Sequence, residues 1–257
     1  MTLSNIVKYG LVESYVMLSF GNVTTLTIIK VVAIAMCCIL GYLLGSINFA
    51  IIISKFKHDD VREHGSKNAG ATNMLRTYGK KAAFLTFAGD FLKAVVACLL
   101  GGLLWGHNGM YLAGLFCVVG HIFPIFYKFK GGKGVATVAG VMLTCNVGAF
   151  LVVFALYAGV FLMTKYVSLA SVMCAFMYPF ILHRMDLLFS IAPDLHITFA
   201  LAMSVLVIIK HIPNINRIIN RTEPKTYFSR KKRAEQKAAM EQAQTKSKKS
   251  LHNEEDT

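Results

Sequence analysis

The stretch that decides the fold is residues 31–54, VVAIAMCCILGYLLGSINFAIIIS, which contains no Asp, Glu, Lys or Arg. A helix of about 20 apolar residues crosses a ~30 Å hydrocarbon core, so this stretch is long enough to span a membrane. Residues 94–127, 134–164, 166–183 and 195–209 are equally free of these charges. With 55% hydrophobic and only 16% charged residues, the composition excludes a soluble globular enzyme, a disordered protein and a secreted disulfide scaffold. The sequence therefore predicts an integral membrane protein.

Breaks inside the two longest segments set the expected number of spans. Residues 94–127 are too many for one helix and contain the turn-rich stretch WGHNG at 105–109. Residues 134–164 have a second break near 146–148. We therefore expect an all-α bundle of about seven transmembrane helices, or five if the shorter ones are re-entrant or interfacial. Residues 31–54 are expected to form one continuous helix.

The connections between these segments alternate in charge. Residues 55–81 and 128–133 are rich in Lys and Arg, whereas the turns at 105–109 and 145–149 contain neither. Because Lys and Arg collect in cytoplasmic loops, we expect the N-terminus outside and the C-terminus in the cytoplasm. We divide the chain into an N-terminal extension (1–24), a membrane domain (25–225) and a polar, basic cytoplasmic tail (226–257) that is disordered or partly helical.

The net charge of +14 has an ordinary explanation in such a protein. Basic loops and anionic headgroups account for it better than nucleic acid, which we exclude as a partner. The six cysteines all lie in apolar segments without a C-x-x-C pair, so neither a disulfide framework nor a zinc site is indicated. We expect no metal and no cofactor.

The first of three polar clusters at the expected cytoplasmic surface is GSKNAGATNMLR at 65–76. Glycine lets a backbone approach a ligand closely, hydroxyl and amide groups bind it, and a guanidinium suits phosphate. A loop with two helix N-caps is an equally good interpretation of this cluster alone. The candidate ligand-binding residues here are Gly65, Ser66, Asn68, Gly70, Thr72, Asn73 and Arg76.

The second cluster is KGGKG at 130–134, directly before an apolar helix that starts at Val135. Exposed amides, the positive end of a helix dipole and the ammonium of Lys133 together predict an anion site formed with Gly131, Gly132 and Gly134. It is not a Walker A loop, which needs Ser or Thr where Val135 stands, so nucleotide hydrolysis is not implied.

The third cluster, GHIFP at 120–124, contributes His121, for which a structural hydrogen bond is the favoured interpretation. Asp90 and Lys93 share a helix face at i, i+3, and mutual pairing explains them most simply. The sequence contains no recognisable nucleophile motif. An enzyme built from these residues would work without a covalent intermediate or a metal, and would need an activated substrate.

These motifs, in this order, resemble the bacterial acyl-phosphate:glycerol-3-phosphate acyltransferase family. The matching stretches are 41–47, 66–76, 79–81, 90–93, 120–124, 129–137, 166–171, His211, 214–215 and 222–225. Asn48 and Lys67 stand where the family often has proline and glycine. The resemblance implies a seven-helix enzyme of the bacterial inner membrane that transfers an acyl group from acyl phosphate to the 1-hydroxyl of glycerol 3-phosphate, giving lysophosphatidic acid.

The resemblance also implies roles for particular residues. Ser66, Thr72, Arg76 and Lys133 would hold the phosphates of donor and acceptor, and Ser171, His211 and Asn214 would complete the polar pocket. Acyl phosphate carries its own leaving group, so the hydroxyl attacks directly and a substrate phosphate can accept its proton. The expected partners are the two substrates, membrane lipids and the soluble enzyme that supplies acyl phosphate. A transporter of phosphorylated anions fits less well, since no internal repeat is found and the polar clusters lie at the ends of the spans. A non-catalytic scaffold also fits less well, because it would not need three polar clusters on one face.

Overall fold

The computed structural model describes residues 10–11, 14, 23–189 and 195–227, and within these ranges it contains helices and no strand. Almost all of the expected N-terminal extension and basic tail lies outside them. The helices are α2 (Val23–Ser46), α3 (Phe49–Lys55), α4 (Ala71–Thr77), α5 (Lys80–Ile122), α6 (Val135–Cys145), α7 (Val147–Thr164), α8 (Val167–Phe189) and α9 (His196–Ile219), with 3-10 turns at Val61–Glu63 and Ile125–Tyr127.

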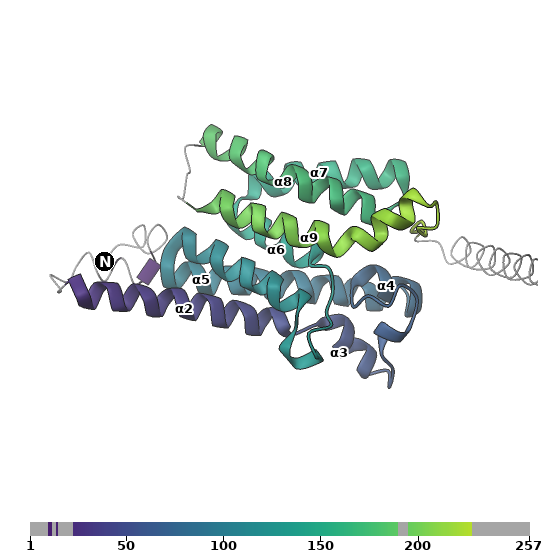
Figure 1. The fold of residues 1–257 in the computed structure, drawn as a ribbon, viewed down its shortest axis with the longest axis horizontal. Coiled ribbons are helices and arrows are strands. Elements are labelled where there is room, and N and C mark those ends of the chain that lie inside the picture. Colours follow the sequence, from purple (N-terminus) through teal and green to yellow (C-terminus); the bar gives the residue numbers. More distant parts are fainter. Residues whose placement is uncertain (1–9, 12–13, 15–22, 190–194, 228–257) are drawn as a thin grey trace, which may run out of the picture.

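The helices form two groups with α6 between them (Figure 1). In one group α2 packs along α5, and in the other α8 packs against both α7 and α9. Small residues bring α2 and α5 together, because a Cβ on Gly41 would lie 2.3 Å from the carbonyl oxygen of Ala113, and one on Gly45 would lie 2.1 Å from that of Cys117. Close approach of this kind is typical of helices packed in a membrane.

Five helical stretches of the described chain are long and apolar enough to cross a membrane. One of them contains α5, which departs from helical geometry at Trp105 and Gly106 and folds back so that Gly109 packs on the carbonyl of Gly101. The break expected at 105–109 is therefore confirmed. The second expected break is confirmed at Asn146, which separates the 11-residue α6 from α7. Counting both arms of α5 separately, the described part has seven apolar helical segments of ten or more residues.

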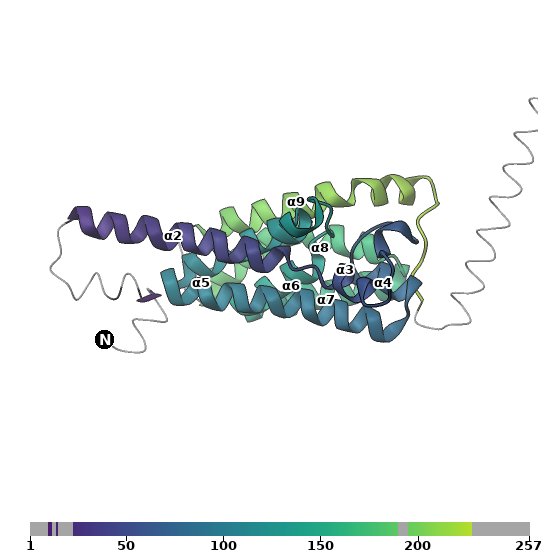
Figure 2. The same cartoon turned by 90° about the horizontal axis from the view of Figure 1, so that it is seen from below.

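The prediction of one helix over residues 31–54 is wrong. α2 ends at Ser46, and Asn48 starts α3 by accepting a hydrogen bond from the backbone N–H of Ile51. This break lets α3 turn away from the axis of α2. As a result α3, α4 and the C-terminal end of α9 gather at one end of the bundle (Figures 1 and 2).

Candidate active site

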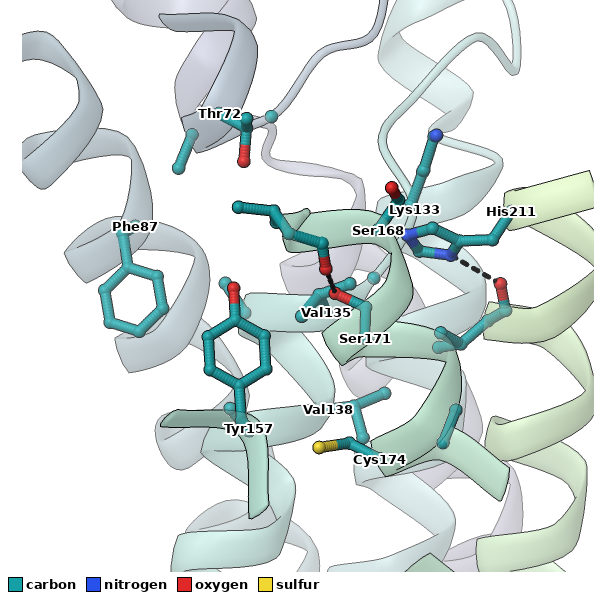
Figure 3. Close-up of a pocket in the computed structure, with 18 of the residues that line it drawn as sticks. Thr72, Phe87, Lys133, Val135, Val138, Tyr157, Ser168, Ser171, Cys174 and His211 are labelled. Carbon is teal, nitrogen blue, oxygen red and sulfur yellow. Dashed lines mark hydrogen bonds between the residues drawn. The ribbon is translucent and has the colours of Figure 1, made fainter. Parts of the chain in front are cut away.

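A cavity of about 410 Å³ lies between the two groups of helices, at the end where α3 and α4 gather (Figure 3). One end of it is polar and contains the ammonium of Lys133 and the guanidinium of Arg76. The rest is apolar and runs between α5, α6, α7, α8 and α9. Its apolar lining includes Phe87, Phe91, Val138, Met142, Phe150, Val153, Phe154, Tyr157, Cys174, Ala175 and Val207.

The three polar clusters of the sequence meet at this cavity. The expected site residues that line it are Ser66, Asn68, Gly70, Thr72, Asn73, Arg76, His121, Lys133, Gly134, Ser171, His211 and Asn214. Gly65, Gly131 and Gly132 do not line the cavity. Residues almost 150 positions apart in the chain are therefore brought to one place by the packing of α4, α6, α8 and α9.

Lys133 is held by a chain of hydrogen bonds from the end of α9. Its ammonium donates to Oδ1 of Asn214, whose Nδ2 donates to Oε1 of Glu223 at 2.7 Å. Glu223 also accepts from Ser168 and from Arg217, each at 2.7 Å. Because an ammonium only donates, the oxygen of the Asn214 amide must face Lys133 and its nitrogen must face Glu223.

Glu223 was not among the site residues expected from the sequence, although it lies in the TEPK stretch at 222–225 and lines the cavity. A carboxylate just after the last span is typical of a solvated loop, and nothing local distinguishes it. Only the return of this segment over the end of the bundle brings it to Asn214. There, Arg76 also donates to the carbonyl oxygen of Pro224 at 3.1 Å.

The electrostatics of the polar end favour an anionic ligand. Burial lowers the pKa of Lys133 from 10.5 to about 8; Glu223 opposes this shift, whereas Arg217, Arg76 and Lys210 add to it. Burial also lowers the pKa of Arg76, which still stays protonated. Burial raises the pKa of Glu223, but hydrogen bonds from Asn214, Ser168 and Arg217 outweigh it and hold the pKa below the ordinary value. An anion between Arg76 and Lys133 would relieve their mutual repulsion.

Gly131 and Gly132, which precede α6, do not have the anion-binding role expected from the sequence. The N–H of Gly131 donates to the carbonyl of Ile122 at 3.3 Å, and that of Gly132 donates to the carbonyl of His121 at 3.1 Å. These amides are engaged within the protein, so the expectation that they stay exposed for an anion is wrong. The absence of a side chain is what matters, since a Cβ on Gly132 would lie 2.2 Å from Nε2 of His121. The anion-facing feature that remains is the N-terminus of α6, where residues 133–136 all line the cavity.

Asn73 holds the first cluster in shape. Its Nδ2 donates to the carbonyls of Val61 and His64 at 3.0 and 2.9 Å, and its Oδ1 accepts from the N–H of Ser66 at 3.0 Å. A Cβ on Gly65 would lie 2.3 Å from this same Oδ1. Asn73 and Gly65 therefore shape the loop, while Ser66, Asn68 and Thr72 keep side chains at the cavity.

Two further polar side chains are anchored on their own helices. Nδ1 of His211 donates to the carbonyl of Val207 at 2.8 Å, and the hydroxyl of Ser171 donates to that of Val167 at 2.8 Å (Figure 3). The bond to Val207 places the proton of a neutral His211 on Nδ1, so its Nε2 is an acceptor.

His121 is buried beside Asp90 and Lys93. The expected ion pair between these two residues is confirmed, with 2.8 Å between Nζ of Lys93 and Oδ1 of Asp90. The Lys93 ammonium is 3.0 Å from Nδ1 of His121, a structural hydrogen bond of the favoured kind. Within the part of the chain that the structure describes, no three His, Cys, Asp or Glu side chains converge as metal ligands do.

Comparison with known proteins identifies the family of this chain. The model of the family described as glycerol-3-phosphate acyltransferase matches residues 35–221. The glycerol-3-phosphate acyltransferase of Bacillus subtilis is 43% identical over 196 residues, which is 75% of this chain and 97% of that protein. That of Finegoldia magna is 42% identical over 191 residues, covering 73% and 93%.

Solved structures of PlsY, an integral membrane glycerol 3-phosphate acyltransferase, have the same fold. Its glycerol 3-phosphate form matches with a TM-score of 0.70 at 37% identity, covering 76% of this chain and 96% of that one. Its lysophosphatidic acid form matches with a TM-score of 0.68 at 36% identity over the same shares. With its long apolar helices, the chain is a multi-pass membrane protein, and it belongs to the glycerol-3-phosphate acyltransferase family.

Proposed function

We propose that this glycerol-3-phosphate acyltransferase takes its acyl group from acyl phosphate and forms lysophosphatidic acid and inorganic phosphate at the cytoplasmic face of a bacterial inner membrane. The observation that carries the proposal is the two-ended cavity, in which a cationic end adjoins an apolar arm. An acyl phosphate has the same division between an anionic head and an apolar chain. Because the cationic end lies where α3, α4 and the end of α9 gather, the basic loops support a cytoplasmic position for it.

The apolar arm has the depth to take much of an acyl chain. From Gly134 at its polar end to Met142, both of which line the cavity, α6 advances about 12 Å at ~1.5 Å per residue. Aromatic side chains from α5 and α7, including Phe91 and Phe154, line the same arm. Burial of methylenes against this lining would contribute about 0.8 kcal/mol each. The acyl chain of the donor would thus be anchored in the apolar arm, while the phosphate of the donor lies at the N-terminus of α6.

In the proposed reaction the 1-hydroxyl oxygen of glycerol 3-phosphate attacks the acyl carbon. The new ester C–O bond forms as the anhydride C–O bond breaks, and the electron pair of that bond leaves with phosphate. Lys133 and the positive end of α6 would stabilise the charge that accumulates on the departing phosphate. Arg76 and Thr72 would hold the second phosphate and so orient the hydroxyl.

The hydroxyl proton would pass to a phosphate oxygen of the substrates. The two carboxylates that line the cavity, Glu223 and Asp90, already accept hydrogen bonds or an ion pair from protein groups, which supports this assignment. Glu223 accepts from Ser168, Asn214 and Arg217, and Asp90 is paired with Lys93. Nε2 of His211 is the second candidate for the proton, since its Nδ1 is tied to Val207.

The test uses purified protein in detergent with labelled glycerol 3-phosphate and, in separate arms, acyl phosphate, acyl-CoA and acyl carrier protein thioester. We expect lysophosphatidic acid from acyl phosphate alone, and a loss of about 10²–10³-fold in rate for Lys133→Ala. Lys130→Ala, in the same loop but exposed, is the matched control and should keep its rate. Equal rates from acyl-CoA would overturn the donor assignment, and no product from the folded wild type would overturn the reaction.

A further inference from the structure

Lys93, on the first arm of α5, is buried, with 4% of its side chain exposed, and it does not line the cavity. Its ammonium contacts four groups. It donates to the carbonyls of Gly45 and Ile47 at 2.9 and 2.6 Å and to Oδ1 of Asp90 at 2.8 Å, and it lies 3.0 Å from Nδ1 of His121. One side chain therefore joins the end of α2, the break after it and both arms of α5.

These contacts stabilise the break between α2 and α3. The last carbonyls of a helix have no partner within it, and an unsatisfied carbonyl at membrane depth is costly. Lys93 satisfies two such carbonyls, and Asp90 accepts from the N–H of Phe49 at 3.5 Å on the other side of the break. The Asp90–Lys93 pair thus sets where α3 begins.

The same pair reaches the first phosphate-facing loop, residues 66–72, through the break. Asn48, which is fully buried, lies between Ile47 and Phe49, and its Nδ2 donates to the carbonyl of Ala69 at 3.5 Å. Ala69 is itself fully buried and directly precedes the turn that starts α4. The position of this loop therefore depends on the position of the break.

The second phosphate-facing loop, residues 130–134, is reached through His121. Gly132 donates to the carbonyl of His121, and its Cα lies so close that a Cβ would be 2.2 Å from Nε2 of that ring and 2.6 Å from the carbonyl oxygen of Ala69. Gly132 is thus wedged between the two supports, and the two loops touch at this point. Lys93 contacts His121 directly, and it reaches Ala69 through the carbonyl of Ile47 and the next residue, Asn48.

We propose that Lys93 is a positioning residue that sets the distance between the 66–72 loop and the 130–134 loop, and with it the distance between the two substrate phosphates. The inference rests on the proposed function, in which both substrates carry phosphate. Misplacement of reacting groups by about 1 Å costs ~10²-fold in rate. Lys93 itself does not line the cavity; it acts through the two loops and through Asp90 and His121, which do line it.

The test separates positioning from mere stabilisation. Lys93→Met alone would take the ammonium partner from the buried carboxylate of Asp90, so the variant to use is the double one, Lys93→Met with Asp90→Asn, which removes both charges together. We expect this variant to elute as a folded protein with a kcat about 100-fold below wild type. KM for each substrate should change less than about threefold, because each phosphate still meets its own loop. Lys81→Met, exposed on the same helix, is the matched control.

A folded double variant with wild-type kcat would overturn the inference, as would a loss carried by KM with kcat unchanged. If the double variant does not fold, Asn48→Ala cuts the link to Ala69 and leaves the charge pair intact; it should lower kcat roughly tenfold, again with little change in KM. Unchanged kcat in Asn48→Ala would then refute the inference. Failure of the proposed function is distinct, because it appears in the wild type as absence of product from acyl phosphate.

Discussion

The lowered pKa of Lys133 makes a sharp prediction for the pH dependence of the reaction. The ammonium is the form that binds phosphate, and burial lowers its pKa to about 8. The pH dependence of kcat/KM reports the pKa values of groups in the free enzyme. We therefore expect kcat/KM to decrease as the pH rises through about 8, where Lys133 loses its proton. At pH 9 a group with this pKa is about one-tenth protonated, so kcat/KM should be roughly tenfold lower than its plateau.

The direction of the shift in a variant follows from the contacts of Glu223. Its negative charge opposes the lowering of the Lys133 pKa, so Glu223→Gln should move the alkaline limb to lower pH. Lys133→Arg keeps a cation that does not titrate in this range. The alkaline decrease of kcat/KM should therefore be absent in this variant, whatever the absolute value of its kcat/KM. The assay is kcat/KM for glycerol 3-phosphate from pH 6 to 10, with melting followed at each pH.

Two results would refute this reasoning. One is a wild-type kcat/KM that stays constant from pH 7 to pH 10 while the protein remains folded. The other is an alkaline limb in Glu223→Gln that moves to higher pH. Either would mean that the titration of Lys133 does not limit substrate capture.

Three further predictions concern stability and loop shape. Glu223→Ala leaves buried donors of Ser168 and Asn214 unsatisfied, which should cost about 3 kcal/mol and lower Tm by roughly 6–12 °C in a detergent melt; an unchanged Tm would contradict this. Gly132→Ala should lower the rate at least tenfold, since its Cβ has no room, whereas Gly159→Ala, with nothing within 4 Å, should match wild type in the same assay. Lys67 has a left-handed φ of 56°, so Lys67→Gly should relieve about 1–2 kcal/mol of strain against ~0.5–1 of glycine entropy, and a Tm below wild type would argue against it.

Local features of the sequence were sufficient for the class of protein and most of its helices. Long stretches without charge predict membrane helices, because hydropathy acts on each segment alone. The breaks at Trp105–Gly106 and at Asn146 were also found, since turn-forming residues carry their conformational preference with them. The order of the polar motifs was enough to indicate the family, which the comparisons then established.

Other features depend on contacts between distant residues and could be decided only by the tertiary structure. The break at Ile47 has no local proline, and it is stabilised by Lys93, which lies 46 positions further along the chain. The amides of Gly131 and Gly132 look available in the motif, but they are engaged by carbonyls at the end of α5. Glu223 reaches the site only because the segment after α9 returns over the bundle to Ser168, 55 positions away. The sequence by itself determined which residue types this protein has for binding phosphate, and the packing of the helices decided which of them face the cavity and which support it.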